Sequence, residues 1–90
     1  MYMNYTIIDT REPFEYQQSH VPGAINIPPM QFMQGGVPSA LAKTPKDAPI
    51  ILYCRSGQRS NTCGMLLRQH GFTNLTNGKN EGHVRKLLAE

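Results

Sequence analysis

Short apolar runs alternate along the chain with stretches of helical periodicity. The clearest run, residues 49–54, is continuously apolar up to Cys54, as expected of a strand that is covered on both faces. Three shorter runs are also predicted as strands: residues 6–9, 24–27 and 72–76. This order of elements predicts an α/β fold with a small, mostly parallel central sheet.

Helical patterns fill the intervals between the apolar runs. Glu12 and Pro13 predict a short helix after the first run, because proline suits a first helical turn and a carboxylate suits the positive end of the helix dipole. Asn77-Gly78 is a pair typical of turns, and residues 84–88 have the spacing of a final amphipathic helix. Helices between parallel strands pack on both faces of a sheet, which predicts a three-layer sandwich.

The longest helix is predicted directly after the strand that ends at Cys54. A polar loop over residues 55–59 leads to a helix that begins near Ser60, with Ser60 or Asn61 as its cap. Gly71 stands where helices commonly end in a left-handed residue. One face of this helix carries residues at helical spacing: Cys63, Leu66, Leu67 and His70.

The length and the charge of the chain narrow the classes of function. Ninety residues leave room for one domain, which we expect to span residues 1–90. Nine Lys and Arg against six Asp and Glu give a net charge of +3, which is too mild for a nucleic-acid interface but suits a small anionic substrate. No apolar stretch approaches the ~20 residues that span a bilayer, and no signal peptide is predicted. We therefore expect a cytoplasmic protein without nucleic-acid or membrane partners, or a periplasmic one if a leader has been removed.

The cysteine and histidine content excludes two further kinds of site. Two cysteines are too few for a disulfide framework, which favours a reducing compartment. The cysteines and the three histidines show no zinc-binding spacing. Neither a metal nor a cofactor is therefore predicted.

The segment that follows Cys54 has the composition of an anion cradle. A strand delivers the cysteine to a short polar loop, and the free N–H groups of a helix start follow at once. Gly57 permits unusual backbone angles, and Arg55 and Arg59 add positive charge. These features favour thiolate over thiol, so we expect the pKa of Cys54 to lie below its usual value of about 8.5. The candidate binding residues are those of the loop and the helix start: Arg55, Ser56, Gly57, Gln58, Arg59 and Ser60.

Other reactive side chains are predicted to have structural roles. Cys63 lies on the apolar face of the helix, where a small buried residue packs well. Asp9 and Arg11, at the end of the first strand, are expected to brace loops by hydrogen bonds. His20 precedes Pro22-Gly23, which favours packing in a turn over acid–base chemistry.

Three segments together resemble the rhodanese superfamily. Residues 9–28, "DTREPFEYQQSHVPGAINIP", resemble its first signature; "YCRSGQRS", residues 53–60, resembles its active-site loop; and "GFTNL", residues 71–75, resembles its last strand. The resemblance covers most of the chain and implies the family's parallel sheet with helices on both sides. It also implies that Cys54 accepts a sulfane sulfur from a donor such as thiosulfate or a persulfide. The resulting persulfide passes its sulfur to cyanide, a thiol or a protein.

The chain departs from the pattern of this family at two places. Glu15 aligns where two-domain thiosulfate enzymes have a substrate-binding arginine, so we expect a carboxylate that faces the pocket and opposes a dianion. Efficient use of thiosulfate is therefore not expected. The usual Gly-Gly and Trp after the last strand are replaced by "NGKNEGHV", to which no role can be assigned from the sequence.

Three other functions remain open on the sequence. A sulfur relay, which takes persulfide sulfur from one protein and hands it to another, is almost as well supported as chemistry on free thiosulfate. A non-catalytic docking module is less well supported, because Cys54 is present. Phosphatases and arsenate reductases of similar fold have longer cysteine loops, with an arginine six residues after the cysteine. Here Arg59 follows Cys54 by five residues, which favours sulfur transfer.

Overall fold

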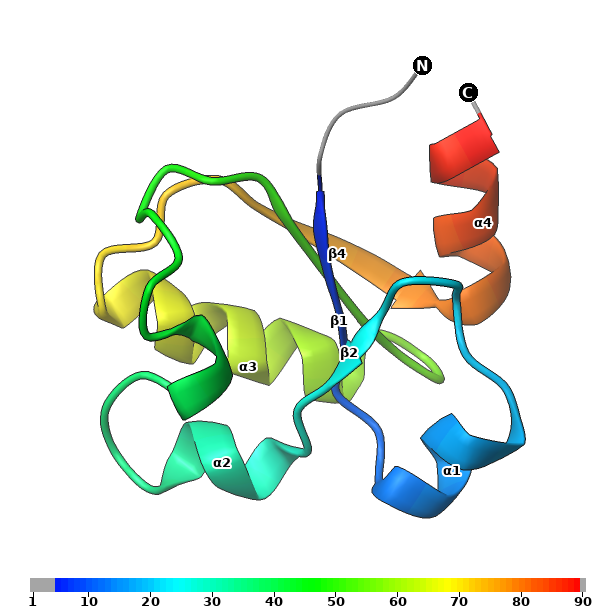
Figure 1. Cartoon of the computed structure of the whole chain (residues 1–90), viewed down its shortest axis with the longest axis horizontal. Helices are drawn as coiled ribbons and strands as arrows, with labels where there is room; N and C mark the ends of the chain where they lie inside the picture. Colours follow the sequence, from blue (N-terminus) through cyan, green and yellow to red (C-terminus); the bar gives the residue numbers. More distant parts are fainter. Residues whose placement is uncertain (1–4, 90) are drawn as a thin grey trace.

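The four strands of the computed structural model, which describes residues 5–89, form one parallel sheet. Their spatial order is β2-β1-β3-β4, so that β3 lies between two neighbours (Figure 1). The strands are β1 (Thr6–Asp9), β2 (Ile25–Asn26), β3 (Ile50–Cys54) and β4 (Leu75–Asn80). All five residues of β3 are buried, which explains its uninterrupted apolar sequence.

Helices cover both faces of this sheet, and the predicted three-layer α/β fold is confirmed (Figure 1). The helices are α1 (Pro13–Gln18), α2 (Pro29–Met33), the 3-10 turn η1 (Ser39–Leu41), α3 (Gln58–Gln69) and α4 (Glu81–Ala89). Alternate residues of β3 point to opposite faces: Ile50 and Leu52 pack with α2, η1 and α3, whereas Ile51 and Tyr53 pack toward α1 and α4. No helix within residues 5–89 has the length and apolarity to cross a membrane.

The last strand differs from the prediction in its position and in its sequence. Strand β4 runs over Leu75–Asn80, so the predicted turn at Asn77-Gly78 is wrong. A Cβ atom added to Gly78 would lie 2.5 Å from Val84 Cγ2 and 2.8 Å from Ile51 Cγ2. The glycine is therefore required because β4 packs closely against β3 and α4.

The start of α3 also lies two residues earlier than predicted. The helix begins at Gln58, and Gly57 caps it with a left-handed φ of 97°. Only Arg55, Ser56 and Gly57 therefore separate Cys54 from the helix. At the other end Gly71 is left-handed, with φ of 95°, as predicted, but His70 is exposed and does not share the buried face.

Candidate active site

Cys54 is the last residue of β3, at the carboxyl edge of the sheet where parallel α/β folds bind ligands. Strands β1 and β4 pair with β3 on either side of it. Cys54 is only 2% exposed. The position matches the sequence prediction, with the sulfur at the base of a short loop that leads into α3.

Backbone N–H groups converge on the Cys54 sulfur. The Gly57 N–H donates to Sγ over 3.1 Å, and the Ser60 hydroxyl oxygen lies 3.6 Å from Sγ. Burial raises the pKa of Cys54, but hydrogen bonds from the Ser60 hydroxyl and from the Ser60, Gly57 and Ser56 N–H groups outweigh it. The result is a pKa lowered to about 7. The predicted direction is right, although the hydrogen bonds from Ser60 and the backbone contribute more to the decrease than the charge of Arg59 does.

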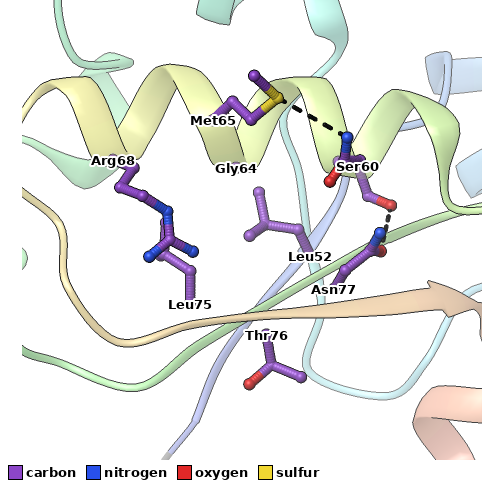
Figure 2. Close-up of a pocket in the computed structure, with 9 residues that line it drawn as sticks. Leu52, Ser60, Gly64, Met65, Arg68, Leu75, Thr76 and Asn77 are labelled. Carbon is purple, nitrogen blue, oxygen red and sulfur yellow. Dashed lines mark hydrogen bonds between the residues drawn. The ribbon is translucent and has the colours of Figure 1, made fainter.

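Asn77 joins the site through Ser60, a link that the sequence does not indicate because the pair Asn77-Gly78 is typical of a turn. The Ser60 hydroxyl donates to Asn77 Oδ1 over 2.7 Å (Figure 2). The Asn77 amide donates to the Gly57 carbonyl over 3.0 Å. A hydroxyl has one proton. When Cys54 is a thiolate, the Ser60 proton can turn to sulfur, because Asn77 Oδ1 still accepts from the Lys79 N–H at 3.0 Å.

A small cavity lies behind this contact. It has a volume of about 60 Å³ and opens between α3 and β4 (Figure 2). Its lining runs from Ser60 and Asn77 at one end to Arg68 and Leu75 at the other. Ser60 therefore lies both at one end of the cavity and among the donors to the Cys54 sulfur, whereas Gly57 does not line the cavity.

Glu15 forms ion pairs with both arginines of the loop region. Its carboxylate lies 3.1 Å from Arg55 Nε and 2.9 Å from Arg59 Nη1. The carboxylate also accepts from the Glu12 N–H over 2.9 Å, at the start of α1. Glu15 is 6% exposed, and the hydrogen bond from Arg59 holds its pKa down to about 2. The expectation that the Glu15 carboxylate faces the pocket is therefore wrong. The carboxylate is buried against Arg55 and Arg59 and neutralises part of their charge.

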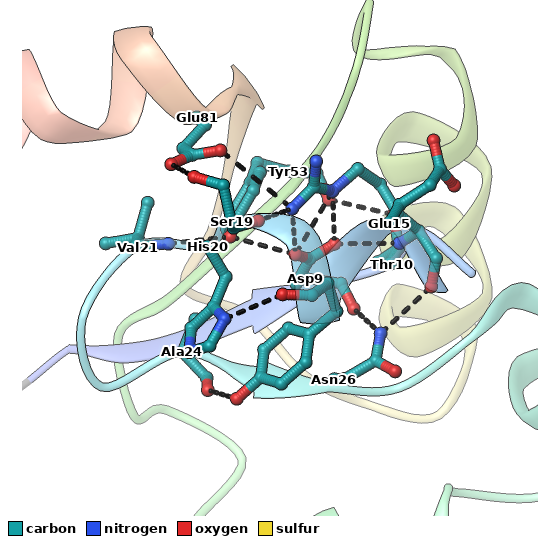
Figure 3. A network of polar contacts seen from close by, with 12 residues as sticks. Asp9, Thr10, Glu15, Ser19, His20, Val21, Ala24, Asn26, Tyr53 and Glu81 are labelled. Carbon is teal, nitrogen blue, oxygen red and sulfur yellow. Dashed lines mark hydrogen bonds and ion pairs between the residues drawn. The ribbon is translucent and has the colours of Figure 1, made fainter. Parts of the chain in front are cut away.

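Asp9 lies at the end of β1 within a network of polar contacts (Figure 3). It forms a buried brace with Arg11. Arg11 Nη2 donates to Asp9 Oδ2 over 2.7 Å and to the Ser19 carbonyl over 2.6 Å. The Tyr53 hydroxyl donates to the same Asp9 oxygen over 2.9 Å, and burial raises the pKa of Tyr53. This network fixes the α1 loop against the residue that precedes Cys54, which agrees with the predicted bracing role.

Three further side chains do not take part in the hydrogen bonds to the Cys54 sulfur: those of His20, Gln58 and Cys63. His20 stacks on Tyr16 with ring centroids 3.7 Å apart, and its Nδ1 lies 2.8 Å from the Tyr16 carbonyl. Gln58 begins α3 with an exposed side chain. Cys63 is fully buried within α3, and burial raises its pKa to about 12.

Comparisons with known proteins agree with the fold. A family model described as "Rhodanese-like domain" matches residues 2–81. The thiosulfate sulfurtransferase PspE of Escherichia coli is 37% identical over 78% of this chain, and the thiosulfate:glutathione sulfurtransferase of Saccharomyces cerevisiae is 32% identical over 79%. The chain spans 64% and 57% of the lengths of these two relatives. A solved structure described as "rhodanese with anions from E. coli" superposes with a TM-score of 0.75 and 33% identity, over 88% of this chain and 89% of that one.

Proposed function

The chain belongs to the rhodanese-like domain family, and we propose that it is a sulfurtransferase in which Cys54 carries a sulfane sulfur as a persulfide. The observation that carries this proposal is a buried thiol with a pKa of about 7, held by N–H donors at the carboxyl edge of a parallel sheet. A thiolate is the nucleophilic form of cysteine, and this site supplies it at neutral pH. The names of the two relatives support the same reaction class.

In the first step the Cys54 thiolate attacks the outer sulfur of the donor. A new S–S bond forms at Cys54 as the S–S bond of the donor breaks, and the donor remnant leaves with the electron pair. The remnant is sulfite when the donor is thiosulfate and a thiol when the donor is a persulfide. The product carries a negative charge on its terminal sulfur, and the N–H groups of Ser56, Gly57 and Ser60 are suited to hold this charge.

In the second step an acceptor attacks the terminal sulfur of the persulfide. A thiol, as its thiolate, becomes a persulfide, and cyanide becomes thiocyanate. Cys54 leaves as the thiolate, which the same N–H groups stabilise. Both steps need one nucleophile and one anion cradle, and neither step requires a separate acid or base.

The ion pairs of Glu15 with the two arginines favour persulfide or polysulfide donors over thiosulfate. Arg55 and Arg59 are the cations that follow Cys54, but both pair with Glu15. Two arginines and one carboxylate leave a single net positive charge, whereas thiosulfate carries two negative charges. We therefore propose that thiosulfate is used slowly. A relay that takes its sulfur from a protein persulfide uses the same first step.

The alternative functions, a phosphatase and a docking module, are less consistent with these contacts. A phosphatase needs a longer loop that encloses a tetrahedral anion and an arginine free to hold it. Here three residues separate Cys54 from α3, and Arg59 is engaged by Glu15 at 2.9 Å. A docking module would not need a cysteine whose pKa is lowered by dedicated donors.

Intact-mass spectrometry tests the proposal directly. The protein is exposed to thiosulfate or to an alkyl persulfide and then freed of excess donor. We expect the wild type and Cys63→Ser to gain one sulfur atom, and Cys54→Ser to gain none. The gained sulfur should be lost on addition of cyanide or a thiol. A sulfur gained by Cys54→Ser, or no gain by the wild type with either donor, would exclude the mechanism.

A further inference from the structure

Lys79 has a backbone conformation that side chains rarely adopt. Its φ is 71°, and it is the one residue other than glycine with a positive φ in the described part of the chain. It stands in β4 where the register with β3 shifts between Leu52 and Tyr53, so that Lys79 lies opposite Tyr53, next to Cys54. A left-handed conformation at a non-glycine residue is unfavourable, and such residues concentrate at functional sites.

The backbone and the stem of Lys79 pack against the loop that holds the Cys54 sulfur. A Cβ atom placed on Gly57 would lie 3.4 Å from Lys79 Cγ and 3.5 Å from Lys79 Cα. Gly57 is the residue whose N–H donates to Cys54 Sγ. Gly57 therefore lies between the stem of Lys79 and the Cys54 sulfur. The ammonium nitrogen of Lys79 is three bonds beyond Cγ.

The charge of Lys79 is not neutralised by a carboxylate, in contrast to the arginines. Lys79 is exposed, and within residues 5–89 no ion pair involves it. Two carboxylates of this region are already engaged: Glu15 by Arg55 and Arg59, and Glu81, two residues after Lys79, by Arg85 at 2.8 Å. Because the stem of Lys79 packs beside Gly57, its ammonium group can add a second positive charge to the single one that Glu15 leaves.

We propose that Lys79 is the specificity-determining cation of the Cys54 site, favouring sulfur donors that carry two negative charges. The inference rests on the proposed sulfurtransferase function and deepens it. Glu15 reduces the attraction of the loop for a dianion, and Lys79 restores part of it. The use of thiosulfate that remains then depends on Lys79 of β4 in addition to the single positive charge that the arginines retain.

Two donors that differ by one charge separate this role from a structural one. Thiosulfate is a dianion, and methanethiosulfonate is a monoanion that also transfers its outer sulfur. In each case the thiolate forms a new S–S bond, and sulfite or methanesulfinate leaves with the electron pair. Steady-state KM and kcat are measured with both donors for the wild type, Lys79→Met and Lys79→Gly. Methionine keeps most of the stem without the charge, whereas glycine removes the stem and relieves the strained φ.

We expect Lys79→Met to raise the KM for thiosulfate about fivefold and the KM for methanethiosulfonate less than about twofold, with kcat little changed. The difference between wild type and variant should shrink at high salt, because screening weakens the attraction. Lys79→Gly should show the same change in KM and a melting temperature higher by a few degrees. Lys43→Met, which removes an exposed charge beyond η1, should leave both KM values unchanged.

The other outcomes each have a definite meaning. If Lys79→Met behaves as the wild type while Lys79→Gly impairs both donors equally, Lys79 only braces Gly57 and the inference is wrong. Equal losses with both donors for Lys79→Met overturn it as well. If the wild type takes sulfur from neither of these donors nor from an alkyl persulfide, the proposed function fails and the inference fails with it. Uptake from the alkyl persulfide alone leaves the proposed function standing and overturns the inference. Uptake by the wild type with unchanged variants removes the inference alone.

Discussion

The two cysteines of this chain are equally buried and yet differ in their chemistry. Cys54 is 2% exposed and precedes α3, whereas Cys63 is 0% exposed and lies within α3. The pKa of Cys54 is lowered to about 7, whereas burial raises that of Cys63 to about 12. Burial acts in the same direction on both thiols. The difference between them therefore comes from hydrogen-bond donors.

The origin of these donors explains why only one position is activated. Cys63 lies within α3, where the N–H groups are used by the helix itself. Cys54 precedes the helix, where the first N–H groups are free and Gly57 turns one of them toward the sulfur. A thiol is therefore activated by its place relative to a helix start, and removal from solvent by itself has the opposite effect.

The largest expected difference is in the rate of alkylation. With iodoacetamide at pH 7, we expect Cys54 to react at least about a thousandfold faster than Cys63, because about half of Cys54 is thiolate at that pH. The rate at Cys54 should follow a single titration with a midpoint near 7. Peptide mapping after timed quenching measures both sites in one sample. A midpoint at or above about 8.5 for Cys54, or comparable labelling of Cys63, would contradict the comparison.

The stability of the fold should depend on pH in opposite ways through the two thiols. The folded-state pKa of Cys54 is lowered from 9.0 to about 7, so its thiolate stabilises the fold above pH 9, and this contribution is lost as the pH falls to 7. Cys63 has a raised pKa, so the unfolded chain ionises first and stability falls as the pH rises above 9. Each slope is about 1.4 kcal/mol per pH unit.

Urea unfolding under reducing conditions between pH 6 and pH 10 measures these slopes. The free energy of unfolding of wild type minus that of Cys54→Ala should rise from pH 7 to pH 9. The same difference for Cys63→Ala should fall above pH 9. Two parallel difference curves would show that the thiols share one environment and that the comparison is wrong.

The positions of the two cysteines in the fold could be predicted from the sequence, because they depend on local patterns. The apolar run up to Cys54, the polar loop and the helical spacing around Cys63 are properties of adjacent residues, and they placed both thiols correctly. The three-layer fold also followed from the order of the elements. Local sequence is sufficient here because strand and helix periodicity directly determine which side chains are buried.

The contacts across the sheet were not predictable in this way. Glu15 meets Arg59 over a separation of 44 residues, and Asn77 meets Ser60 over 17. Asn77-Gly78 favours a turn by local propensity, but the close packing of Gly78 against Val84 and Ile51 places the pair within a strand. Tertiary packing decided these positions, and both of them determine the surroundings of the Cys54 sulfur.

Ser60→Ala should sharpen the comparison by removing one donor from Cys54 alone. The Ser60 hydroxyl lies 3.6 Å from Sγ and lowers the pKa of Cys54 together with the backbone N–H groups. We expect the alkylation midpoint of Cys54 to rise by about one pH unit, with Cys63 unchanged. Thr62→Ala is the matched control, because its hydroxyl donates to the Gln58 carbonyl on the exposed side of α3. An unchanged midpoint in Ser60→Ala would assign the whole effect to the backbone.

Glu15→Gln should have the smallest effect, and it tests whether charge adds to the backbone donors at all. Glutamine keeps a hydrogen-bond acceptor for the Glu12 N–H and the arginines but removes the negative charge between Arg55 and Arg59. The freed positive charge should lower the alkylation midpoint of Cys54 by a few tenths of a pH unit and lower the KM for thiosulfate about two- to fivefold. Cys63 should remain unreactive.

Glu12→Gln is the control that gives this last experiment its meaning. It removes the same charge three residues earlier, from an exposed side chain of the same helix start. If both variants shift the KM for thiosulfate equally, the effect is one of net charge and the ion pairs of Glu15 have no special role. If neither variant shifts it while circular dichroism shows both to be folded, the arginine charge does not reach the donor. The contrast between Cys54 and Cys63 would then depend on oriented N–H and O–H donors alone, with Glu15 serving only to hold α1 against the cysteine loop.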